Sequence, residues 1–195
     1  FYFQTTPPSC GGDVCVNPGF AWNHGNVQEE IGNTWVGFVG PGVKNLGVDS
    51  GTWTDHTNVR PTINELLGLR DSYRDDGRVL VEALDSRAVV QSLRAHRETL
   101  LRLGSAYEQV NAPFGSFAAD TLAASTRALK SADEGVYSSL ESRIADLTAQ
   151  RDALALRISI ALNDAAAGSP LDEQLAKRWI AEADQLLAEA RALAG

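Results

Sequence analysis

The chain has 195 residues, of which 44% are hydrophobic, 22% charged and 7% aromatic. Such a chain buries one sizeable core or two small ones, and disorder, collagen and a bare coiled coil all fit it poorly. Its 17 Lys and Arg stand against 25 Asp and Glu, for a net charge of -8. Nucleic acid is therefore an unfavourable partner, because cations that neutralise phosphate are in deficit. No run of about 20 apolar residues predicts a transmembrane segment, and no signal peptide is recognisable.

The N-terminal end of the sequence is typical of a fragment or a processed product. The chain contains no methionine and begins in mid-pattern at Phe1. Cys10 and Cys15 stand among Ser, Pro and Gly residues that leave the backbone free to fold back. Two interpretations of this pair stay open: a small disulfide loop, which indicates an oxidising compartment, or two free thiols on a surface loop. The expected location is secreted or cell-envelope, with the signal upstream.

The first 85 residues hold short apolar runs separated by Gly and Pro. The run at 19–22 is short and apolar, and the run at 34–39 is apolar on both faces, which is typical of strands covered by helices. A helix is expected to begin at Pro61, and Gly68 is placed to end it. The order strand, loop, strand, loop, helix predicts an α/β sheet layer for residues 1–85, with its chemistry on loops at strand ends.

Residues 86–195 are instead rich in Leu, Ala, Arg and Glu, and their apolar residues are spaced by three and four. Such stripes predict helices that bury one face against each other. The four helices are expected at about 93–110, 117–129, 140–162 and 170–193. Short turns between them favour an antiparallel helical bundle, which can also support self-association through helices. The predicted chain is therefore an α/β domain over 1–85 followed by an all-α extension over 86–195.

Two histidines are the polar residues that stand out in the first part. His24 lies in an Asn-His-Gly triplet and His56 in the run Thr-Asp-His-Thr. They are 32 positions apart, too far for a local zinc motif, so only the folded chain can bring them together. Spacing alone favours two histidines hydrogen-bonded in loops, and a metal site is the alternative. Asp55, next to His56, is a candidate for a carboxylate that bonds the imidazole of His56 and so orients it toward a metal ion.

Three segments of the first part, taken in order, are similar to a known family. They are FAWNHGNVQ at 20–28, TWVGFVGPGV at 34–43 and TDHTNVRPT at 54–62. Together they resemble the C-terminal metal-binding part of the alkaline phosphatase superfamily. The similarity is greatest to its bacterial phosphoesterase and type I phosphodiesterase or nucleotide pyrophosphatase members, and it covers about residues 19–84.

The resemblance implies that the chain is the C-terminal part of a metal-dependent phosphoric ester hydrolase. By position, His24 and His56 fall on histidine ligands of two different metal ions, and Asn23 falls where the family has an aspartate. An amide oxygen is a weaker donor than a carboxylate, so Asn23 either holds the metal less tightly or fixes His24. The nucleophile and the remaining ligands lie upstream in the family, so no catalytic residue is expected in this sequence.

The reaction implied by the resemblance is attack on a phosphate ester by an alkoxide, with two divalent ions stabilising the entering and leaving oxygens. Imidazole suits zinc and carboxylates also admit manganese or calcium, so the metal stays open. Arg60, beside the expected helix start, is a candidate for binding the substrate anion, and a structural role is the alternative. The rival function is a non-catalytic helical interaction module with a degenerate or truncated phosphoesterase segment.

Overall fold

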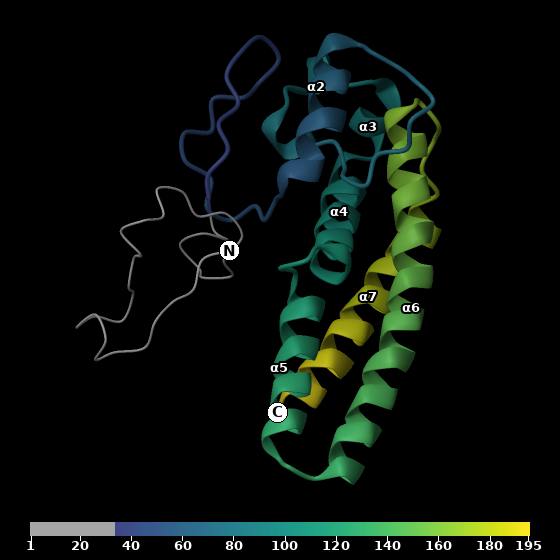
Figure 1. The fold of residues 1–195 in the computed structure, drawn as a ribbon. Coiled ribbons are helices and arrows are strands. Elements are labelled where there is room, and N and C mark those ends of the chain that lie inside the picture. The colour runs from purple at the N-terminus through teal and green to yellow at the C-terminus, as the bar shows by residue number, and fades with distance from the viewer. Residues whose placement is uncertain (1–33) are drawn as a thin grey trace, which may run out of the picture. The chain divides into compact units, whose positions relative to one another are not determined.

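The computed structural model describes residues 34–195 (Figure 1). They comprise the last four residues of a first unit, Phe1–Gly37, and the whole of a second compact unit, Phe38–Gly195. About 67% of the described residues are helical, and none of them lies in a strand of a β-sheet. The expected α/β sheet domain over 1–85 is therefore wrong for the part of the chain that the structure describes.

The expected strand at 34–39 shows why that prediction fails. These residues have no regular secondary structure, and Trp35 and Val39 are 88% and 99% exposed. An apolar run forms a strand only where a second chain segment accepts its backbone hydrogen bonds. Among residues 34–195 the sole sheet-like pairing is one isolated antiparallel bridge between Val43 and Leu84. The run has the apolar composition of a buried strand, but no segment pairs with it within the described residues.

A short antiparallel contact surrounds that bridge. The Lys44 amide donates to the Ala83 carbonyl and the Asp85 amide donates to the Gly42 carbonyl, each at 2.8 Å. Gly42 has a φ of 83° and its position leaves no room for a side chain, since a Cβ there would lie 2.8 Å from the Cβ of Ala88. Glycine is thus required for this contact, both by conformation and by space.

Helix α2 (Val59–Leu67) follows a single-turn 3-10 helix, η1 (His56–Asn58). The helix ends where the sequence predicts, because Gly68 adopts a left-handed φ of 65°. It begins two residues before Pro61, since η1 runs directly into its first turn. This continuous path places His56 at the N-terminal entrance of α2.

An irregular segment, residues 69–90, connects α2 to the helices that follow. It contains two single-turn 3-10 helices, η2 (Val81–Ala83) and η3 (Ser86–Ala88). Four of its buried apolar side chains belong to the main hydrophobic core: Val79, Val81, Leu84 and Val89. The C-terminal part of the expected α/β domain is therefore an irregular segment packed on helices.

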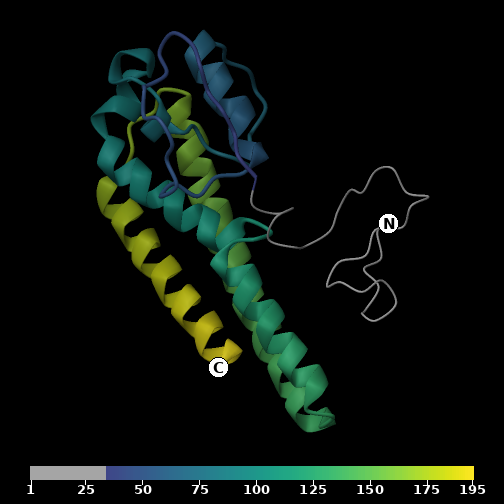
Figure 2. The same cartoon turned by 90° about the vertical axis from the view of Figure 1, so that its left-hand side faces the viewer.

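Five helices make up the rest of the chain: α3 (Gln91–Ala95), α4 (Arg97–Asn111), α5 (Ser116–Lys130), α6 (Glu134–Ala166) and α7 (Glu173–Ala194). Helices α4 and α5 follow one another along α6, and α7 runs antiparallel to α6 and packs against α4, α5 and α6 (Figures 1 and 2). The α5–α6 hairpin extends past the C-terminal end of α7 (Figure 2). No helix in the described range is long and apolar enough to cross a membrane.

The core lies between these helices and explains why they form. Most of its fully buried side chains come from α4, α6 and α7, where they follow helical spacing: Leu103, Leu147, Leu154, Ile158, Ala176, Ala183 and Ala190. Each helix thereby buries one apolar stripe, which is the main source of helix stability in a folded protein. Alanines on the inner face of α7 allow close approach to its neighbours.

Helix α7 starts three residues later than its expected first residue, 170. The Asp172 carboxylate accepts a hydrogen bond from the Leu175 amide at 2.9 Å, which is the geometry of an N-terminal cap. The sequence contains both the Ser-Pro pair and this aspartate, and the structure uses the aspartate.

Candidate functional site

His56 is the one predicted metal ligand that lies among the described residues. It is the first residue of η1, directly before α2, and it is exposed. No hydrogen bond or ion pair of its imidazole with another residue of 34–195 is present. The preceding Asp55 caps the turn instead, since its carboxylate accepts from the Thr57 amide at 2.8 Å and from the Thr57 hydroxyl. The role of Asp55 in orienting His56 stays a prediction.

Asn58 lies beneath this turn and is 1% exposed. Its Nδ2 donates to Thr54 Oγ1 and to Glu108 Oε1 on α4, both at 2.8 Å. Its Oδ1 accepts from the Arg78 amide, also at 2.8 Å. Both amide hydrogens and the carbonyl oxygen are therefore used, and Asn58 joins the His56 turn to the irregular segment and to α4.

Arg78 extends the same polar cluster. Its Nε donates to Glu108 Oε1 at 2.8 Å, and its two terminal nitrogens form parallel hydrogen bonds with the Glu82 carboxylate at 2.7 and 2.9 Å. The side chains of Arg78 and Glu108 are each only 4% exposed. Gly104 on α4 makes the space for the guanidinium, because a Cβ there would collide with the Cδ and Nε of Arg78. The Arg78 guanidinium thus forms hydrogen bonds with two carboxylates, those of Glu82 and Glu108, at a site with little access to water.

Burial raises the pKa of Glu108 to about 7, although Arg78 and Asn58 favour its ionised form. Its Oε2 is buried and has no hydrogen-bond partner among residues 34–195, while Oε1 accepts two hydrogen bonds. A proton on Oε2 leaves both of those bonds intact. Glu108 is therefore a buried acid that titrates near neutral pH.

Gly77 allows the irregular segment to lie directly against the His56 turn. A Cβ at this position would lie 2.6 Å from the Asn58 amide nitrogen and still closer to the carbonyl group of Thr57. No side chain fits there without moving one of the two backbones. The buried side of the turn consequently contacts Gly77 and, through Asn58, Glu108 on α4.

Arg60 lies in the first turn of α2 and is engaged by the loop that follows the helix. Its guanidinium forms ion pairs with Asp71 and Asp75. It also lies over the ring of Tyr73, with 4.5 Å between Cζ and the ring centroid. These contacts hold the loop against α2, which is a structural role. The role of Arg60 in binding a substrate anion stays a prediction. In this structure its guanidinium is paired with the carboxylates of Asp71 and Asp75.

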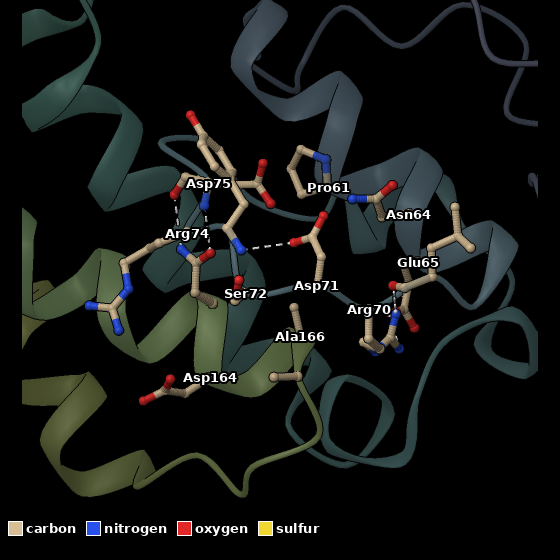
Figure 3. Close-up of a pocket in the computed structure, with 14 residues that line it drawn as sticks. Pro61, Asn64, Glu65, Arg70, Asp71, Ser72, Arg74, Asp75, Asp164 and Ala166 are labelled. Atoms are coloured by element: carbon tan, nitrogen blue, oxygen red, sulfur yellow. Dashed lines mark hydrogen bonds and ion pairs between the residues drawn. The ribbon is translucent and has the colours of Figure 1, made fainter.

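An open pocket of about 190 Å³ lies between α2, this loop and the C-terminal end of α6 (Figure 3). Glu65 on its wall accepts from Arg70 at 2.9 Å and from the Val90 amide at 2.6 Å. The Asn163 side chain accepts from the Asp75 amide at 2.9 Å and donates to the Asp75 carbonyl at 3.0 Å. These polar groups bond one another across the pocket wall, so they hold the loop in place and point to no ligand.

The other predicted site residues lie outside the described residues: Cys10, Cys15, Asn23 and His24. Their roles stay predictions. Within residues 34–195 no group of three or more His, Cys, Asp or Glu side chains is arranged to hold a metal ion. A single imidazole does not make a zinc or manganese site. The described residues alone therefore do not fit the two-metal site that the resemblance implies.

Sequence reasoning missed the buried polar cluster under His56. Asn58 stands within the run that carries the resemblance, two residues after His56, but nothing in the run separates a buried asparagine from an exposed one. Glu108 gave a clearer signal, because it follows Gly104 by four residues on the α4 face that also carries buried apolar residues. A glutamate on an apolar face beside a glycine predicts a buried partner of opposite charge.

Comparison of the chain with protein-family models, with curated proteins and with solved structures gives no match. The resemblance to the alkaline phosphatase superfamily therefore depends on the three sequence segments alone.

Proposed function

We propose that this chain contributes His56 as a metal ligand to a metal-dependent phosphoric ester hydrolase of the phosphodiesterase or phosphatase type. The placement of His56 carries this proposal. Its imidazole is exposed at the entrance of α2, on a turn whose other polar groups bond one another. A histidine ligand needs an accessible ring nitrogen on a well-held backbone, and His56 meets both conditions.

The exposed apolar side chains before this turn support the same proposal. Val39 and Val48 are almost fully exposed, and Leu46 is about half exposed. Apolar side chains gathered on one exposed segment commonly mark contact with further protein. We infer that additional protein covers this segment and provides the nucleophile and the remaining metal ligands. His24 and Asn23 keep the ligand roles that the resemblance implies, and no catalytic residue is assigned to this chain.

The first test uses the chain as it stands. Because the described residues offer one exposed imidazole, that of His56, and a metal site needs several donors, we expect weak binding of zinc and manganese by calorimetry and no hydrolysis of aryl phosphate mono- or diesters. Turnover that disappears in His56→Ala would contradict the assignment of the nucleophile to other protein. His96→Ala is the matched control, since His96 is half-buried and bonded to Glu173 at 2.9 Å.

The second test uses the longer protein to which we infer this chain belongs. There His56→Ala is expected to lower hydrolysis of phosphate esters by orders of magnitude together with the bound metal, whereas His96→Ala retains both. Metal content equal to wild type in the His56→Ala protein would remove His56 from the site.

A non-catalytic helical interaction module is the second candidate, and a separate observation favours it. The α5–α6 hairpin extends past the end of α7 (Figure 2) and carries the exposed side chains of Leu122, Leu129 and Val136. Such side chains can bury themselves against another helix. If this is the function, Leu122→Ser with Leu129→Ser abolishes self-association in sedimentation velocity while His56→Ala leaves it unchanged. A monomer at all concentrations would exclude self-association.

A further inference from the structure

Four side chains form one buried cluster that connects three separate parts of the fold: Asn58 below the His56 turn, Arg78 and Glu82 in the irregular segment, and Glu108 on α4. We call this cluster the clamp. Within the clamp, every hydrogen bond between these parts involves Asn58 or Arg78, and both of these side chains bond the same oxygen, Oε1 of Glu108. The protonation state of Glu108 therefore affects both of these hydrogen bonds.

The charges within the clamp do not balance when Glu108 is ionised. Arg78 then faces two carboxylates, so the cluster carries a net negative charge, and Oε2 of Glu108 lacks a donor among the described residues. When Glu108 is protonated, Arg78 and Glu82 remain a balanced pair with two parallel hydrogen bonds. Burying an unbalanced charge costs free energy, and a balanced pair with satisfied hydrogen bonds costs much less.

Further charged groups lie around the clamp. Lys44 donates to the Glu82 carbonyl at 2.9 Å, and Arg97 on α4 donates to the Val81 carbonyl. The Tyr107 hydroxyl donates to the Asp76 carbonyl at 2.7 Å. The titratable or charged residues of the surrounding elements are therefore Lys44, Asp55, Asp76, Arg97 and Tyr107. Lys44 and Arg97 bond backbone carbonyls, and neither donates to Oε2 of Glu108.

We propose that the clamp is a proton-dependent latch. When Glu108 is protonated, the clamp holds the turn that contains His56 against α4, and when Glu108 ionises, that turn loosens. The direction follows from linkage. Burial raises the pKa of Glu108 to about 7 from its ordinary value of 4.5. When the turn opens, the Glu108 carboxyl is exposed to water and ionises with its ordinary pKa of 4.5. Between pH 4.5 and about 7 the closed form therefore binds more protons than the open form. The latch is complete below pH 4.5 and weakens as the pH rises through 7.

The consequence for His56 as a metal ligand rests on the proposed function, but the latch itself does not. Its measurement needs no metal and no substrate. If the latch is present and His56→Ala keeps its metal, the proposed function fails while the latch stands. If the latch is absent and His56→Ala loses metal, only the present inference fails.

The experiment is amide hydrogen exchange on the whole chain between pH 5 and pH 8, corrected for the intrinsic exchange rate at each pH. For the amides of α2, the opening equilibrium constant is expected to rise on the order of 70-fold across this range, given a pKa that moves between 4.5 and about 7. The corresponding constant for buried positions of α6 should change less, because those amides do not depend on opening of the turn. A flat profile for α2 would overturn the proposal.

Two substitutions with the same chemistry separate the latch from a general effect of charge. Glu108→Gln imitates the protonated form, so we expect the pH dependence of α2 exchange to disappear. Glu98→Gln is the control, since Glu98 is exposed on the same helix and its loss of charge should leave the profile unchanged. A Glu108→Gln protein with the wild-type profile would contradict the proposal.

A third variant covers the case in which Glu108→Gln does not fold. Glu82→Gln removes the competing carboxylate, so Arg78 then pairs with Glu108 alone and the midpoint of the pH profile should move to lower pH. Carboxyl carbon NMR of Glu108 in the wild-type chain measures the same property directly. A midpoint near 4.5, or one that Glu82→Gln leaves in place, would overturn the latch.

Discussion

Asn58 shows how much a single buried amide can determine in this chain. Its amide group donates hydrogen bonds to Thr54 and Glu108, and its carbonyl oxygen accepts one from the Arg78 backbone amide. If the side-chain amide were removed, the buried Arg78 N–H would lose its acceptor and Glu108 Oε1 would lose one of its two hydrogen bonds. An unsatisfied buried polar group costs more than the bond itself contributes.

Asn58→Ala should therefore lower the free energy of unfolding by about 2 kcal/mol, more than a surface asparagine would. The measurement is urea unfolding at pH 7, with Asn64→Ala as the control because Asn64 on α2 is only partly buried. An equal loss of unfolding free energy in the two variants would mean that the hydrogen bonds of Asn58 stabilise the fold no more than the side chain of Asn64 does.

At the residue scale the sequence identified candidate residues, whose roles stay predictions, but it did not identify the bonds that these residues form. His56 and Arg60 were selected for their types and their neighbours, and both lie at the entrance of α2. Their bonding could not be predicted, because the partners of Arg60 come from a loop 11 and 15 residues away. The partner of Asn58 on α4 is 50 residues away, and no local pattern contains that information.

At the element scale, the helices were predictable because the sequence pattern that indicates a helix lies within the helical segment itself. The stripes of α6 and α7 repeat within one segment, and Gly68 marks the end of α2 by its own conformation. A strand is different, since it is defined by a partner elsewhere in the chain. The run at 34–39 has the composition of a buried strand but lacks such a partner among the described residues. Composition alone therefore gave the wrong element there.

The start of α7 gives a prediction at this scale. Asp172 accepts from the Leu175 amide and satisfies one of the free amides of the first turn. Asp172→Ala should therefore lower the free energy of unfolding by about 1 kcal/mol. Asp184→Ala is the matched control, because Asp184 is exposed in the middle of the same helix and alanine is favourable there. Urea unfolding of the two variants decides, and a loss in Asp184→Ala as large as in Asp172→Ala would contradict the capping role.

At the scale of the whole unit Phe38–Gly195, the question is whether the part before residue 85 and the helical part after it unfold together. The expected boundary at residue 85 falls inside this unit. Hydrogen bonds cross it, through the clamp and through the Arg97 contacts with Val81 and Leu84. Most fully buried side chains, however, come from α4, α6 and α7. The helices thus have the larger share of the core, and the segment before residue 85 depends on them.

We therefore predict two levels of hydrogen-exchange protection. The amides of Leu154 and Ile158 in α6 should exchange only through global unfolding, and low concentrations of urea should accelerate their exchange steeply. The amides of Lys44 and Asp85 belong to an isolated bridge, so they should exchange orders of magnitude faster and respond little to urea. If all four amides exchange at one rate with one urea dependence, the whole unit opens as a single cooperative structure and the boundary at residue 85 has no energetic meaning.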